Sequence, residues 1–191
     1  MLSGERVRLR AVEEADLPFF VEWLNDLEVS QWLSRAVPLS MAEEEDWFRG
    51  LRALRPEERP LAIEARTADG WLLIGNSGLG HFEHTCPQAE LGIFIGRKDH
   101  QNQGYGREVL RLLLDYGFGS LNLERIYLRV LAANQRAIHV YEKVGFVHEA
   151  RLRHAVVRDG AYGDILVMSV LRSEWEQGSR ETPGREQGAA G

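Results

Sequence analysis

The chain has very little cysteine, because Cys86 is the only one among 191 residues. A disulfide within the chain and a zinc site built from several cysteines are therefore excluded. The six histidines show no metal-ligand spacing, so we expect no metal. An excess of positive charge is also absent, since the formal net charge is −6. A general nucleic-acid binder normally has a basic surface, so we expect no nucleic-acid partner.

Long hydrophobic runs are missing as well. No stretch approaches the roughly 20 apolar residues that cross a bilayer, so we expect no membrane contact. The first ten residues, MLSGERVRLR, are polar and unlike a signal peptide, which predicts a cytoplasmic protein. With 44% hydrophobic residues, the chain suits one well-buried domain, which we place at residues 1–176. Residues 177–191 contain no large apolar side chain and are expected to form a disordered tail.

Hydrophobic periodicity predicts an alternation of helices and strands. Helices are expected at about residues 17–24, after a capping box that begins at Ser40, after Gly106 and after Asn134. Strands are expected at residues 7–9, 61–65, 71–74, 78–84, 89–95, 126–130, 155–158 and 165–171. Consecutive strands tend to pair antiparallel, whereas a strand–helix–strand unit gives a parallel pair. The order therefore predicts an α/β fold with a mixed sheet flanked by helices; the family resemblance described below implies that this sheet is mostly antiparallel with one parallel pair.

A glycine-containing turn, Gln101-Asn102-Gln103-Gly104-Tyr105-Gly106, joins the strand at residues 89–95 to the next helix. The first turn of a helix has unpaired N–H groups and a partial positive charge, and glycines let a phosphate approach those amides. The turn is not a GxxxxGK[ST] loop, and it lacks the first glycine of a GxGxxG fingerprint. By itself it fits an anion site as well as a tight turn whose glycines have only a steric role.

With its surroundings, this turn resembles the cofactor loop of the GNAT acetyltransferase superfamily, [Q/R]-x-x-G-x-[G/A]. Gln101, Gly104 and Gly106 fill that pattern, and residues 134–146 (NQRAIHVYEKVGF) follow in the family's order. In detail the chain is most similar to the RimJ/RimL-type branch, which includes bacterial spermidine N-acetyltransferases. The resemblance covers residues 7–175 in element order and is specific from about residue 90 to residue 168.

The resemblance implies the GNAT fold, acetyl-CoA as the acyl donor, and roles for particular residues. Asn134 would contact the pantetheine arm, and Tyr141 would lie near the sulfur as the general acid. From the residues alone, Tyr141 is typical of a core side chain and Asn134 of a helix cap. Backbone groups of the preceding strand and of the loop would bind the arm and the pyrophosphate, namely Ile93, Phe94 and Ile95 for the arm, and Gln101, Asn102, Gln103, Gly104, Tyr105, Gly106 and Arg107 for the pyrophosphate.

The reaction implied is direct attack of a primary amine on acetyl-CoA within a ternary complex. An amine is mostly protonated at neutral pH, so a base is needed. Glu90, on the strand that leads to the cofactor, is the first candidate, and an exposed strand glutamate is the alternative; His148, Glu149 and His154 are weaker candidates. The acceptor is expected to be a protein N-terminus, a polyamine or another small amine, and residues 34–37 lack the acidic pair that a polyamine would favour.

Two other functions stay open at this point. The chain could be a non-catalytic GNAT-fold module that senses acyl-CoA, although the tyrosine argues against it. The loop alone would also permit a different phosphate-ligand enzyme, which the downstream helix does not favour. A homodimer is compatible with the family.

Overall fold

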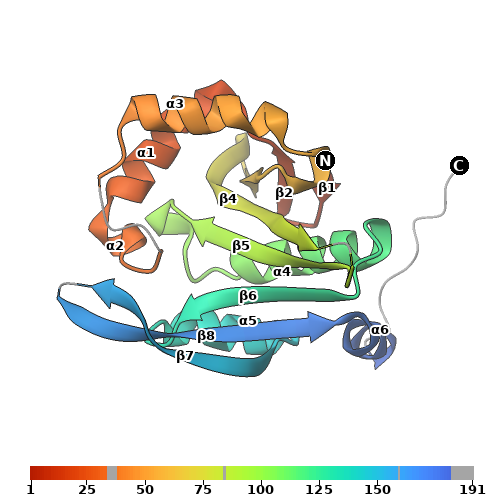
Figure 1. The fold of residues 1–191 in the computed structure, drawn as a ribbon. Helices are drawn as coiled ribbons and strands as arrows, with labels where there is room; N and C mark the ends of the chain where they lie inside the picture. The colour runs from red at the N-terminus through yellow and green to blue at the C-terminus, as the bar shows by residue number, and fades with distance from the viewer. Residues whose placement is uncertain (34–37, 84, 159, 182–191) are drawn as a thin grey trace, which may run out of the picture.

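The computed structural model describes residues 1–33, 38–83, 85–158 and 160–181 (Figure 1). One helix, α6, runs into the segment predicted to be a tail and contains residues 177–181; residues 182–191 lie outside the described part. Residues 34–37, which lack an acidic pair, also lie outside it. The main elements, in chain order, are β1 (Leu2–Ser3), β2 (Val7–Ala11), α1 (Leu17–Asn25), α2 (Leu27–Ser30), α3 (Met41–Gly50), β3 (Leu61–Thr67), β4 (Gly70–Glu83), β5 (Gln88–Ile95), α4 (Tyr105–Asp115), β6 (Arg125–Leu131), α5 (Gln135–Val144), β7 (Val147–Arg158), β8 (Ala161–Leu171) and α6 (Arg172–Glu181).

The strands form one sheet in the order β1-β2-β3-β4-β5-β6-β8-β7. Every neighbouring pair is antiparallel except β5 and β6, which α4 connects. A crossover helix returns the chain to the same end of the sheet, and this is why these two strands are parallel. The predicted mixed sheet with one parallel pair is confirmed.

Several strand boundaries differ from the prediction. The strands expected at residues 71–74 and 78–84 are a single strand, β4, because polar Asn76 and Ser77 pair with β3 and β5 and do not form a turn. β7 begins at Val147, directly after α5, well before the predicted residue 155. Its exposed, charged sequence has no apolar alternation that would reveal a strand, and it is held by pairing with β8.

Helices cover the sheet on both faces (Figure 1). The amphipathic stripe of α4 packs into the larger core against buried residues of the central strands, such as Ile74, Leu91 and Leu128. A second core lies under α1, where Phe20 and Trp23 pack on Ala62 and Leu73. α1 and α4 therefore each bury one apolar face, as their periodicity predicted. No helix in the described residues is long and apolar enough to cross a membrane.

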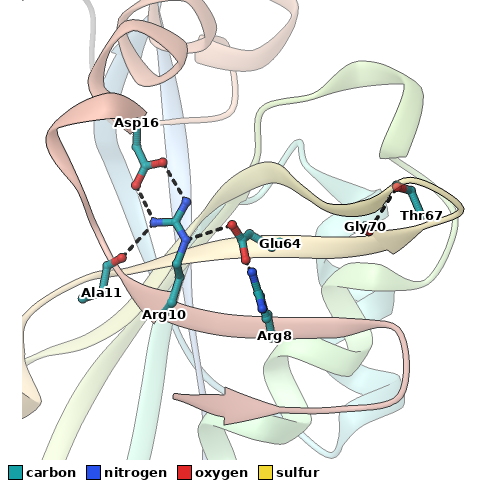
Figure 2. Close-up of polar contacts among 7 residues, drawn as sticks. All are labelled: Arg8, Arg10, Ala11, Asp16, Glu64, Thr67 and Gly70. Carbon is teal, nitrogen blue, oxygen red and sulfur yellow. Dashed lines mark hydrogen bonds and ion pairs between the residues drawn. The ribbon is translucent and has the colours of Figure 1, made fainter.

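A buried ionic network fixes the first strands to the start of α1 (Figure 2). Glu64 on β3 is only 6% exposed and forms ion pairs with Arg8 and Arg10 of β2. Arg10 also binds both carboxylate oxygens of Asp16, at 2.6 and 2.8 Å. Because these hydrogen bonds satisfy the buried charges, the network tolerates burial that an isolated glutamate would not.

Candidate functional site

The parallel strands β5 and β6 pair over only three residues. Gln88, Ala89 and Glu90 pair with β6, and the pairing stops there. On its other side, β5 stays paired with β4 as far as Ile95. The second half of β5 therefore has one backbone edge that β6 does not cover, and such an edge can bind an extended ligand as an added strand.

A cavity of about 350 Å³ lies at this opening. It is lined by β5 residues from Glu90 to Ile95, by the predicted phosphate loop, and by the starts of α4 and α5. All but Gln103 of the predicted cofactor-binding residues line this cavity, as does Glu90, the first candidate for the base. They are Glu90, Ile93, Phe94, Ile95, Gln101, Asn102, Gly104, Tyr105, Gly106, Arg107, Asn134 and Tyr141.

The loop has the backbone geometry that an anion site requires. Gly104 is the N-cap of α4 and has φ +85°, a conformation that side chains disfavour. Gly106 lines the cavity, and a Cβ added to it would meet no atom within 4 Å. The glycine therefore leaves free space in front of the first amides of an eleven-residue helix, where a phosphate is favoured.

The two glutamines of the loop have different surroundings. The Gln101 amide donates to the carbonyl of Ile95 at 2.8 Å, so its side chain joins the end of β5 to the loop. Gln103 does not line the cavity; its carbonyl accepts a hydrogen bond from Arg6 at 3.1 Å. The side chain of Gln103 donates to the backbone of Asp99. Any contact of Gln103 with the cofactor stays a prediction for its backbone amide.

Asn134 and Tyr141 line the cavity from α5, where Asn134 is the N-cap and Tyr141 lies within the helix. The Asn134 side chain caps this helix by accepting from the Ala137 N–H at 3.2 Å, so the capping role inferred from the residues is confirmed. Tyr141 is partly buried, and its ring lies 5.8 Å from that of Phe146. Burial raises the pKa of the Tyr141 hydroxyl to about 12. The phenol is therefore neutral at pH 7 and can donate a proton or a hydrogen bond into the cavity.

Glu90 lies at the point where the two strands part. Its Cα pairs with Tyr127 of β6 and with Gly80 of β4. Burial raises the pKa of Tyr127 above its usual value, and the negative charge of Glu90 raises it further. The Glu90 carboxylate makes no hydrogen bond or ion pair with another residue in the part of the chain that the structure describes.

The three weaker base candidates lie on β7, away from the cavity. His148 is 3.0 Å from a carboxylate oxygen of Glu142. Glu149 pairs with Arg125, and this ion pair, with a hydrogen bond from Ser169, holds its pKa below the usual range. His154 stacks on Tyr162. The structure therefore brings only Glu90 of the four candidates to the cavity.

Trp32 and Leu33 line the cavity, and they lie in the stretch at about residues 25–40 to which the family resemblance assigns acceptor specificity. Val29, on α2, also lines the cavity and was not singled out from the sequence. This helix has only four residues, too few for a periodic pattern, but Asp26 caps it by accepting from the Glu28 N–H at 2.8 Å. An Asp before a short apolar stretch is therefore the signal that could have revealed it. Two arginines, Arg129 on β6 and Arg136 on α5, also line the cavity and were not singled out from the sequence.

Among the described residues, no group of three or more His, Cys, Asp or Glu side chains is placed to hold a metal ion. The site instead combines an open strand edge, an anion-binding helix start and a neutral phenol in one cavity. This combination fits a long ligand with an amide-containing arm, a phosphate group and a reactive end. It defines the class of enzymes that transfer an acyl group from coenzyme A.

Comparison with known proteins agrees with this class. Residues 6–147 match the model of the acetyltransferase (GNAT) domain. Spermidine N(1)-acetyltransferase of Vibrio cholerae is 32% identical over 173 residues, which cover 90% of this chain and 96% of the relative. A putative ribosomal N-acetyltransferase of Bacillus subtilis is 27% identical over 181 residues, covering 91% and 95%. The chain belongs to the GNAT acetyltransferase family and is an acetyl-CoA-dependent N-acetyltransferase.

The fold agrees as well. The crystal structure of spermidine N-acetyltransferase from Vibrio cholerae in complex with CoA and spermine superimposes with a TM-score of 0.82 at 31% identity. The match covers 91% of this chain and 99% of the other. The predicted GNAT fold and the predicted acyl donor are thus confirmed.

Proposed function

We propose that the enzyme acetylates a primary amine by direct attack on acetyl-CoA in a ternary complex, with Glu90 as the base and Tyr141 as the acid. One observation carries this proposal: both side chains line the same cavity as the phosphate loop. The two elements that carry them, β5 and α5, both line this cavity. An amine that enters between them can meet the thioester with a proton acceptor and a proton donor on hand.

The residues that line the cavity also support a binding path for acetyl-CoA. The open edge of β5 at Ile93, Phe94 and Ile95 supports binding of the pantetheine arm by backbone hydrogen bonds. The amides at the start of α4 support binding of the pyrophosphate. Asn134 has its Oδ1 engaged with Ala137, which leaves its amide nitrogen to contact the arm. When bound, acetyl-CoA supplies the thioester that the amine attacks.

Two proton transfers accompany the reaction, one from the amine and one to the leaving sulfur. Glu90 accepts the proton of the incoming ammonium, directly or through water, and so produces the neutral amine that can attack. Tyr141 donates to the sulfur as the carbon–sulfur bond breaks and the thiolate leaves. A donor aimed at a charge that develops during the reaction lowers the barrier more than it strengthens ground-state binding.

The charges around the cavity bear on the acceptor. Among the described residues that line it, Glu90 is the only carboxylate, whereas Arg107, Arg129 and Arg136 are cationic. Residues 34–37 add no carboxylate, since their sequence is SRAV. An acceptor with a single ammonium, such as a peptide N-terminus or a monoamine, meets less repulsion there than a polyamine does. Spermidine nevertheless belongs in the test, because the Vibrio cholerae relative named above is a spermidine N(1)-acetyltransferase.

The test is release of free CoA thiol with a panel of acceptors: peptides with free N-termini, simple monoamines and spermidine. Wild type is compared with Glu90→Gln at pH 7 and pH 9. The variant should lose about 10²-fold in kcat/KM at pH 7, and less at pH 9, where more of the acceptor is already neutral. An equal loss at both pH values would refute the role of Glu90 as base. Binding of CoA without thiol release from any amine would refute the proposed reaction.

A further inference from the structure

One cation reaches the phosphate loop from another element. Arg136 lies in the first turn of α5, and its guanidinium approaches two side-chain oxygens of the loop. The distances are 3.3 Å from Nη1 to Oε1 of Gln101 and 3.5 Å to Oδ1 of Asn102. Arg136 also lines the cavity. The side chain therefore bridges the gap between the two helices whose first turns face the ligand space.

These contacts orient the guanidinium without neutralising it. Both acceptors are amide oxygens, which carry no formal charge, and Arg136 makes no ion pair with another described residue. An arginine is always protonated and has five N–H donors, so two long bonds from one nitrogen leave most of its capacity unused. The cation is thus held beside an anion-binding loop with its charge uncompensated.

Arg6, just before β2, contacts the same loop and provides a contrast. It donates to the Gln103 carbonyl, but its Nε also lies 3.3 Å from a carboxylate oxygen of Glu108. Its guanidinium stacks over the ring of Tyr105, 5.0 Å from the ring centroid. The charge of Arg6 is therefore matched by Glu108, which fixes β2 to α4, and this gives Arg6 a structural role. Among the residues that the structure describes, no carboxylate pairs with Arg136 in this way.

We propose that Arg136 is a pyrophosphate-binding residue, and that Gln101 positions it. The loop amides bind the phosphate from the α4 side. The guanidinium of Arg136 binds it from the α5 side, because its planar fork matches two phosphate oxygens. Gln101 links this cation to the strand, because its amide donates to Ile95 while its Oε1 accepts from Arg136. The inference rests on the cofactor path proposed above.

The experiment measures the dissociation constants of CoA and of 3′-dephospho-CoA by calorimetry, for wild type and Arg136→Ala. Charge-assisted hydrogen bonds of this kind correspond to a loss of about 10- to 100-fold in affinity. Because both ligands contain the pyrophosphate, the loss should be the same for both. A loss restricted to CoA would overturn the assignment and place Arg136 on the 3′-phosphate.

Arg111→Ala is the matched control. Arg111 lies exposed on α4, near the loop but outside the cavity lining, so its removal changes the net charge by the same amount. It measures the long-range attraction of an anionic ligand alone, and we expect a loss of about threefold or less at physiological salt. An equal loss in Arg111→Ala and Arg136→Ala would refute a direct contact of Arg136.

A double-mutant cycle with Gln101→Ala tests the positioning role. If Gln101 acts through Arg136, its removal should weaken CoA binding clearly in wild type and much less in Arg136→Ala. Additive losses would overturn that part of the inference. Failure of the proposed reaction can be distinguished from failure of this inference, since it would appear as normal CoA affinity in the wild type with no amine acetylated.

Discussion

Replacing Tyr141 with phenylalanine removes a single hydroxyl and keeps the ring. The aromatic contact with Phe146, 5.8 Å between ring centroids, and the packing of α5 on the core should survive. We therefore expect the free energy of unfolding to change by about 1 kcal/mol or less. The same hydroxyl is proposed to donate to the leaving sulfur, so the reaction barrier should change much more than the stability.

The size of the kinetic effect follows from that role. A positioned general acid contributes roughly 10²- to 10⁴-fold, which is about 2.7 to 5.4 kcal/mol of barrier at 1.36 kcal/mol for each factor of ten. Turnover should fall by this factor, whereas the dissociation constant of CoA should change little. Tyr162→Phe is the control, because Tyr162 is 68% exposed on β8 and lies outside the cavity lining.

The raised pKa gives this prediction a second measurement. At pH 9.5 a tyrosine with a pKa of 10 would be about one quarter ionised, but with a pKa of about 12 less than about 1% has lost its proton. The wild-type rate should therefore not fall between pH 8 and pH 9.5. A fall in turnover with a midpoint near pH 10 would refute the raised pKa of Tyr141, and a Tyr141→Phe variant within threefold of wild type would refute its acid role.

Three further changes test the site and the fold. Gly106→Val should raise the dissociation constant of CoA at least tenfold without unfolding the protein, because its side chain would enter open space in front of the helix amides; calorimetry and a thermal melt check both parts. Glu64→Ala should lower the free energy of unfolding by about 3 kcal/mol, measured by urea denaturation, because it leaves Arg8 and Arg10 without their shared carboxylate; a loss below about 1 kcal/mol would contradict this. Glu149→Gln should make stability less sensitive to acid. The Arg125 ion pair lowers the pKa of Glu149, so its stabilisation is complete above the usual pKa near 4.5 and is lost as pH falls through the lower folded value. The difference in melting temperature between wild type and variant should be smaller at pH 3 than at pH 6, and an equal difference at both pH values would argue against the linkage.

Local patterns in the sequence were sufficient for most elements of the fold. The Ser40 capping box, the stripe on α4 and the Asn134 cap are each set by residues within one or two helical turns. The order of strands and helices also predicted a mixed sheet, and the family resemblance implied its single parallel pair. Prediction failed where pairing decided the structure, as in β4, whose polar middle is held by strands on both sides, and in β7, whose residues are almost all exposed.

The sequence alone predicted the elements of the proposed donor site: the glycines of the loop, the helix that follows them, and the tyrosine on the next helix. Only the tertiary structure showed that β5 and β6 part after Glu90, because their pairing depends on how α4 returns the chain to the sheet. It also decided that Glu90 lies in the cavity while His148, Glu149 and His154 do not. Arg136 contacts a loop 34 residues earlier in the chain, a proximity that no local spacing can encode.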